Sequence, residues 1–219
     1  MAPFGASRAG LMSVAGDDIP DSGEYHFVAE DLDSGDDDFV DRINDVSLSA
    51  IGSPSLGSDG LGGHNYVEYD GDDDGHGAAS VDIIEQPFAL ISVVELLSTS
   101  GDNAIMSVQE DSLSAMLWDG DSRDSWSSWF GDAMTGSEND SENVVGVVID
   151  GDESEYRESG EVTGTGDPGD RDIEDLAIGF NAAAPDRFGN IRFYESVVIA
   201  DRDQSKIDEW ESYFLSKYA

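Results

Sequence analysis

The segment Gly189-Asn-Ile-Arg-Phe-Tyr-Glu-Ser-Val-Val-Ile-Ala-Asp-Arg-Asp-Gln-Ser-Lys-Ile-Asp-Glu-Trp-Glu-Ser-Tyr-Phe-Leu-Ser-Lys-Tyr-Ala219 predicts one strand that runs directly into one helix. Ile191 and Phe193 alternate with polar neighbours, as in a strand with one buried face. The β-branched run at 197–199 continues the extended pattern. A strand that hands over to a single helix is a strong indication of fold class.

The helical half of this segment has a start signal and an apolar stripe. Ser205 is followed three residues later by Asp208, a variant of the capping box, so we expect the helix to begin there. Four apolar side chains then recur at helical spacing and predict a buried face: Ile207, Trp210, Phe214 and Tyr218.

Short apolar runs separated by turn residues precede the closing segment. They lie at 25–29, 67–69, 88–97, 113–118, 144–149 and 176–180. The run at 88–97 is almost continuously apolar, which is typical of a central strand buried on both faces. Asp-Gly pairs at 70–71, 119–120 and 150–151 predict tight turns. About ten to twelve strands with one helix indicate a two-sheet sandwich.

The composition is extremely acidic. The net charge is −39, from 10 basic and 49 acidic side chains, and Lys206 and Lys217 are the only lysines. Because the acids are spread through the chain alongside patterned apolar runs, we interpret them as a halophilic surface around an ordinary core. No basic cluster exists, which excludes binding to nucleic acid or to an anionic membrane. Cysteine is absent, which excludes disulfides and thiol chemistry.

The hydropathy pattern predicts neither membrane insertion nor export. The longest uncharged apolar run, 86–94, is about half of a membrane span. No apolar stretch of a secretory signal precedes Asp17.

The first 21 residues differ from the remainder because residues 1–16 are small or apolar and carry Arg8 as their one charged side chain. They carry four apolar anchors, Phe4, Leu11, Met12 and Val14. Two interpretations stay open: a disordered tail, or an arm that docks on a neighbouring subunit.

Several phrases, taken in order, resemble laminin-G-like jelly rolls of the concanavalin-A-like lectin and glucanase superfamily. They lie at 40–47, 65–74, 87–94, 189–195, 198–202 and 213–218. Ile43 stands where the family has tryptophan, and Tyr69 replaces its phenylalanine. The resemblance spans about 24–219 and implies two antiparallel sheets, one of them concave. It implies carbohydrate or protein binding as the usual activity, with hydrolysis in some branches.

We therefore predict an all-β fold: a two-sheet antiparallel jelly-roll sandwich of the concanavalin-A-like type at 22–219. A short C-terminal helix and an N-terminal arm at 1–21 complete it.

Asp70, Asp72 and Asp74 have the spacing of an EF-hand loop, followed by Gly75, but Val81 stands where the bidentate glutamate belongs. This is therefore no EF-hand. A calcium site of another type, calcium being the one candidate cofactor, and a hydrated hairpin turn are the remaining interpretations.

Glu153, Glu155 and Glu158 have the spacing of the carboxylates in retaining glucanases of this superfamily. The middle residue there is Asp, and the segment follows an Asp-Gly turn beside an expected edge strand, so we predict no enzyme. The histidines, at 26, 64 and 76, are isolated in sequence, and we expect them at the surface or in turns.

Trp118, Trp126 and Trp129 gather around Asp121 and Arg123. Aromatic rings with neighbouring polar groups could bind a glycan, whereas a hairpin whose rings complete the core explains the same residues.

These features together predict a structural protein of a virus that infects a salt-loving archaeon, made in the host cytoplasm and carried on the capsid or tail. Other virion proteins, copies of the same chain and a host surface glycan are the expected partners. A glycan-cleaving enzyme that uses Glu153, Glu155 and Glu158 is one alternative, and a purely architectural component without a ligand is another.

The acidic surface predicts that stability falls as salt is diluted, because screening by ions suppresses repulsion between carboxylates. The midpoint of urea unfolding should rise steadily between ~0.1 M and ~3 M sodium chloride. A midpoint that does not change over this range would contradict the halophilic interpretation.

Overall fold

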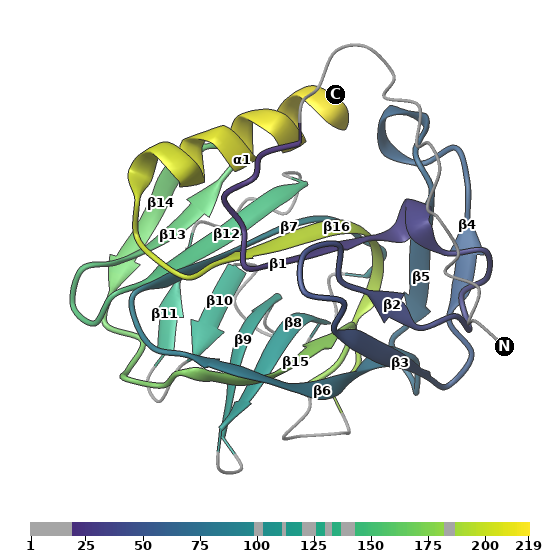
Figure 1. The fold of residues 1–219 in the computed structure, drawn as a ribbon, viewed down its shortest axis with the longest axis horizontal. Helices are drawn as coiled ribbons and strands as arrows, with labels where there is room; N and C mark the ends of the chain where they lie inside the picture. The colour runs from purple at the N-terminus through teal and green to yellow at the C-terminus, as the bar shows by residue number, and fades with distance from the viewer. Residues whose placement is uncertain are drawn as a thin grey trace, which may run out of the picture.

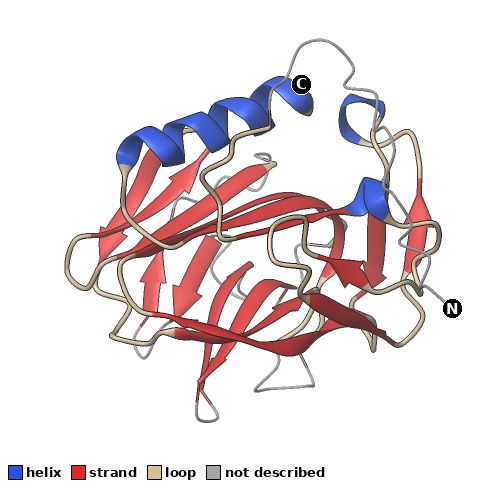
Figure 2. Ribbon diagram, viewed as in Figure 1, coloured by secondary structure: helices blue, strands red, loops and turns tan. Residues whose placement is uncertain are grey.

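The computed structural model describes residues 19–98, 103–110, 113–119, 126–129, 133–136, 143–181 and 187–219, and only the backbone of 78–80, 108–110, 113–119, 126–129, 133 and 135. Two eight-stranded antiparallel sheets pack face to face, and one helix lies across the outer face of the first sheet (Figure 1). Strand dominates every layer except that helix (Figure 2). This arrangement confirms the predicted two-sheet jelly-roll sandwich with a C-terminal helix.

The first sheet carries the helix. Its strands, in spatial order, are β14 (Glu161–Gly166), β13 (Ser154–Glu158), β12 (Val144–Ile149), β7 (Phe88–Leu96), β16 (Asn190–Ile199), β5 (Tyr66–Asp70) and β4 (Ser55–Gly57), and β1 (Tyr25–Val28) also pairs with β16. The run predicted as a central strand is therefore β7, confirmed in place between β12 and β16.

The second sheet lies below the first in Figure 1. Its order is β11 (Ala133–Thr135), β10 (Trp126–Trp129), β9 (Leu113–Asp119), β8 (Asn103–Glu110), β15 (Ile173–Ile178), β6 (Gly75–Ile84), β3 (Ser47–Ile51) and β2 (Phe39–Val40). Two 3₁₀ turns, η1 (Ala29–Asp31) and η2 (Leu61–Gly63), and the helix α1 (Gln204–Lys217) complete the described elements. None of these helices has the length and hydropathy of a membrane span.

Strand alternation divides the apolar side chains between two cores. Phe88, Leu90 and Val94 of β7 join the core between the sheets, whereas Ala89, Ile91 and Val93 join the core beneath α1. Successive side chains of a strand point to opposite faces, so a strand covered on both sides needs apolar residues at nearly every position.

Helix α1 buries the predicted stripe. Ile207, Trp210 and Phe214 are fully buried, and Tyr218 is nearly so. The predicted start is two residues too late, because Asp203 is the N-cap and accepts a hydrogen bond from the Ser205 backbone N–H. Ser205 lies inside the first turn instead of capping it.

A β-bulge in β16 redirects two consecutive side chains. Phe193 pairs with Val94 and Glu195 pairs with Val93, so Tyr194 is the extra residue. A bulge of this kind shifts the alternation by one position. Glu195 shares its register position with Val93, a member of the core beneath the helix, and the carboxylate therefore faces α1.

The Glu195 carboxylate is fully buried and accepts three hydrogen bonds. His26 Nε2 lies 2.5 Å from Oε1, while Lys217 Nζ and the Tyr218 hydroxyl each donate to Oε2 at 2.6 Å. The donors come from β1 and from the last turn of α1. One carboxylate therefore joins β16, β1 and the end of the helix.

Burial alone would raise the pKa of Glu195, but the hydrogen bond and charge of His26, together with the Lys217 ammonium, outweigh it and lower the pKa from 4.5 to about 2. Because the folded pKa lies below the unfolded value, this group stabilises the fold above pH ~4.5, and its contribution is lost as pH falls toward ~2. The difference corresponds to about 3 kcal/mol.

We expect Glu195→Gln to lower the free energy of unfolding at neutral pH by about 3 kcal/mol, since it removes the charge that His26 and Lys217 face. The variant should also lose part of the acid dependence between pH ~5 and ~2, measured by chemical denaturation. Glu209→Gln, on the exposed side of α1, is the matched control. If both variants showed the wild-type pH profile, the stabilising role of Glu195 would be wrong.

Candidate functional site

The predicted glycan-binding tryptophans lie on two adjacent strands. In the backbone register of β9 and β10, Trp118 pairs with Ser127 and Trp126 pairs with Asp119. Trp129 lies two residues beyond Ser127 on β10 and pairs with Ala133 of β11. The three tryptophan positions therefore gather within a few ladder rungs at one end of the second sheet.

Backbone alternation separates these positions into two sets. Met134 is buried in the core between the sheets and pairs with Ser128, so position 128 belongs to the inner face. Neighbouring positions of a strand alternate between the two faces of the sheet, so positions 127 and 129 belong to the outer face. Position 118 is the cross-strand partner of position 127 and therefore belongs to the same face. The pairing of Leu117 with the buried Met106 gives the same assignment. Positions 118 and 129 thus share the outer face, and position 126 does not.

The other predicted partners of this cluster, Asp121 and Arg123, lie outside the described residues. So do the four anchors of the predicted arm, Phe4, Leu11, Met12 and Val14.

The acidic turn between β5 and β6 gathers a different triad from the predicted one. Carboxylate oxygens of Asp70, Asp73 and Asp74 all lie within 4.8 Å of one another. The predicted Asp72 instead donates its backbone N–H to Asp70 Oδ1 at 2.8 Å and is exposed. Asp73 was missed because the EF-hand spacing selects alternate positions, whereas this turn brings adjacent ones together.

Asp74 is the buried member of this triad. It is 6% exposed, and its Oδ1 accepts the Ser53 backbone N–H at 2.6 Å. Burial, followed by the charges of Asp70 and Asp73, raises the pKa of Asp74 despite that hydrogen bond. The folded state therefore binds this proton more tightly than the unfolded chain, and the ionised group lowers stability at neutral pH. Carboxylate oxygens at this spacing could hold calcium.

The backbone register separates two members of the glutamate triplet. Glu158 pairs with Val145, which belongs to the core between the sheets, whereas Glu155 pairs with Val148, which belongs to the core beneath α1. These two glutamates therefore lie on opposite faces of the first sheet. A glycosidase needs two carboxylates on either side of one glycosidic bond, and Glu155 and Glu158 are not placed in that way.

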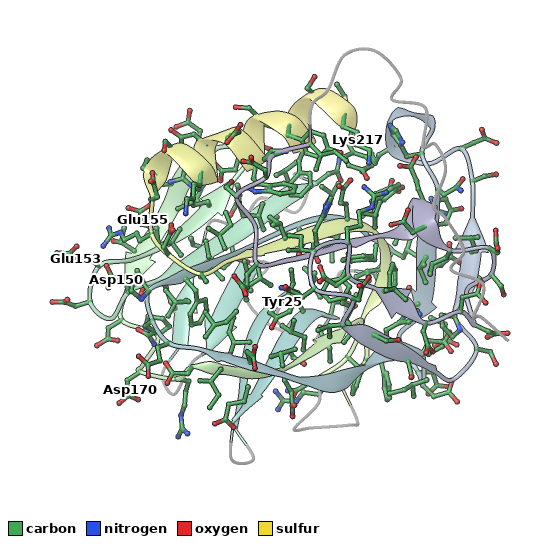
Figure 3. The ribbon with its side chains drawn as sticks, in the orientation of Figure 1. Tyr25, Asp150, Glu153, Glu155, Asp170 and Lys217 are labelled. Atoms are coloured by element: carbon green, nitrogen blue, oxygen red, sulfur yellow. The ribbon has the colours of Figure 1, made fainter. Side chains whose placement is uncertain are left out.

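The outward glutamates take part in ion pairs instead. Glu155 and Glu153 lie near the first turn of α1 (Figure 3), where Arg202 Nη1 is 2.6 Å from Glu153 Oε2 and Nη2 is 3.5 Å from Glu155 Oε1. Arg157 Nη1 donates to Glu155 Oε2 at 3.0 Å and binds Glu211 of α1 through two further nitrogens. These contacts anchor the helix to β13.

The histidine prediction is wrong for His26 and His76, which are buried and bonded to polar partners inside the fold. His64 lies in the loop after η2 and is partly exposed, in agreement with the prediction. Sequence reasoning also missed the cluster around Glu195. The one available signal in the sequence was the scarcity of lysine, which singles out Lys206 and Lys217. In the structure Lys217 donates to the buried carboxylate of Glu195.

Several arginine and lysine side chains among the described residues form ion pairs. Ion pairs with carboxylates are formed by Arg42, Arg157, Arg192, Arg202, Lys206 and Lys217.

No protein-family model matches the chain. No curated protein sequence matches it either. Solved structures do resemble it. The Trypanosoma rangeli sialidase in complex with sialic acid has a TM-score of 0.62 at 13% identity, over 87% of this chain and 32% of the sialidase. This chain thus spans about a third of that protein.

Two further structures share the fold over nearly the same extent. Domain 4 of AbnA, a GH43 extracellular arabinanase from Geobacillus stearothermophilus in complex with arabinotriose, has a TM-score of 0.55 at 15% identity, covering 85% of this chain and 97% of that domain. The receptor-binding domain of botulinum neurotoxin C/D mosaic serotype has a TM-score of 0.57 at 8% identity, covering 88% and 51%. These likenesses establish the fold, a two-sheet β-sandwich.

Asp74→Asn should raise the melting temperature at low salt by about 2 °C, because it removes a buried charge while the amide oxygen can still accept the Ser53 N–H. Asp72→Asn, outside the triad, is the control and should change little. If the triad holds calcium, millimolar calcium should stabilise the wild type and the Asp72 variant but not the Asp74 variant. A lower melting temperature for Asp74→Asn without calcium would show that the ionised carboxylate is stabilising.

Proposed function

We propose that the protein is a structural component of a virus particle that works in strong salt, and that its β-sandwich contacts other particle proteins and a host surface glycan. The glycan contact belongs to the outer face of the second sheet at β9 and β10. The observation that carries this proposal is the register that assigns Trp118 and Trp129 to that one face.

Three features support the binding role. Tryptophan is suited to stacking on sugar rings, and the backbone register assigns positions 118 and 129 to a common face. The fold is shared with a sialidase in complex with sialic acid, an arabinanase domain in complex with arabinotriose and the receptor-binding domain of a botulinum neurotoxin. The opposite facing of Glu155 and Glu158 favours binding without hydrolysis.

The particle role has separate support. The net charge of −39 suits a protein that is exposed to concentrated salt. The first 21 residues, of which residues 1–16 carry Arg8 as their one charged side chain, include Phe4 and Leu11 among their anchors and are suited to docking on a neighbouring copy. A particle component would meet both conditions.

A double variant, Trp118→Ala with Trp129→Ala, tests the binding role within the particle. We expect it to be incorporated into particles normally and to reduce attachment to host cells at least tenfold, since each lost stacking contact costs about 1 kcal/mol or more. Trp126→Ala is the matched control and should leave attachment unchanged when the variant folds.

Each outcome separates the alternatives. Unchanged attachment by the double variant would leave a purely architectural component. Absence of the wild-type chain from purified particles would overturn the particle role. Hydrolysis of a β-glucan that Glu155→Gln abolished would instead support the enzyme.

A further inference from the structure

His64 makes a hydrogen bond through each ring nitrogen. Its Nδ1 lies 2.5 Å from Glu30 Oε1, and its Nε2 lies 3.1 Å from the backbone carbonyl oxygen of Lys217. The first contact joins His64, which directly follows η2, to η1, and the second joins it to the end of α1. His64 therefore links three segments that are distant in sequence.

Both partners of the ring are acceptors. A backbone carbonyl cannot donate. Glu30 is ionised, because its second oxygen lies 3.1 Å from Lys217 Nζ. Burial opposes that ionisation, but His64 and Lys217 outweigh it and lower the pKa of Glu30. A neutral imidazole has only one N–H, so it could satisfy only one of these two acceptors.

His76 shows the contrasting arrangement in the same molecule. Its Nδ1 lies 2.8 Å from the Tyr69 hydroxyl, which can donate, and its Nε2 lies 3.0 Å from the Asp37 carbonyl oxygen. One donor and one acceptor are the partners of a neutral ring. Burial lowers the pKa of His76 to about 4, which agrees with that assignment.

We propose that His64 carries a proton on both ring nitrogens and that this imidazolium is a pH-operated latch, capping the C-terminal end of α1 and holding it on the sandwich. The last carbonyls of a helix lack partners within the helix and carry partial negative charge. A cationic histidine at this point satisfies one carbonyl and interacts favourably with the helix dipole.

The charged groups around the latch come from several elements. Glu30 of η1 and Glu195 of β16 supply two carboxylates, and Lys217 of α1 lies between them, 3.1 Å and 2.6 Å from their oxygens. His26 of β1 also faces Glu195, whereas His64 faces Glu30 and lies 4.9 Å from the Tyr218 ring. When His64 loses a proton, Glu30 keeps only Lys217 as a cationic partner among these groups, and one ring nitrogen of His64 turns its lone pair toward an acceptor.

Release should therefore affect the last turn of α1 before the rest of the fold. The Tyr218 backbone N–H, which donates to Phe214 O at 3.0 Å, reports on that turn. Amides of β7, at the centre of the first sheet, report on global unfolding.

The test combines two measurements on the full chain. At neutral pH, ¹⁵N spectra of the histidine rings should show both His64 nitrogens protonated and His76 with one. As the pH is raised until the ring spectra show His64 deprotonated, the exchange protection of Tyr218, corrected for the intrinsic rate, should fall about tenfold while protection of β7 stays constant.

Two variants complete the design. His64→Gln should show low Tyr218 protection at every pH, whereas His64→Lys, which keeps a positive charge, should keep protection above pH ~8 better than the wild type. A single protonated nitrogen on His64 at neutral pH would overturn the latch. So would a fall in Tyr218 protection that persisted in His64→Gln. The ring spectra of the wild type decide the matter even if a variant fails to fold.

Discussion

The buried carboxylate of Glu195 is the constraint on which the helix-bearing side of the molecule depends. A charge removed from water is tolerated only when donors surround it, and here they come from His26, Lys217 and Tyr218. Lys217 and Tyr218 lie at the C-terminal end of α1, while Arg157 binds Glu211 near the middle of the helix. The helix is thus fixed by polar contacts along its length, and apolar packing fills the space between them.

Much of this fold could be predicted because it follows from periodicity. The near-continuous apolar run of β7 indicated a strand with two covered faces, and the spacing of Trp210 and Phe214 indicated the buried side of α1. The polar interior could not be predicted in the same way. Its key residue faces the helix only because a bulge at Tyr194 shifts the alternation, and no pattern in the sequence marks an extra residue.

The candidate sites show the same limit in a different form. In a chain with 49 acidic residues, carboxylates recur at almost any spacing, so the glutamates at 155 and 158 matched a catalytic pattern while lying on opposite faces. Asp73, not Asp72, joins the acidic triad, because turn geometry rather than spacing determines which carboxylates meet. Trp126 and Trp129 are an odd number of positions apart, and the register of β10 assigns them to opposite faces, because alternation in a regular strand is a property of the backbone itself.

The position of β16 in the first sheet has a consequence for biosynthesis. Its first half pairs with β5, its second half with β1, and nearly its whole length with β7. The first described strand, β1, therefore cannot pair until the last one, β16, has been synthesised. The first sheet cannot be completed while β16 is still within the ribosome. Until then β1, β5 and β7 expose unpaired backbone edges and apolar side chains, both of which favour aggregation of the emerging chain.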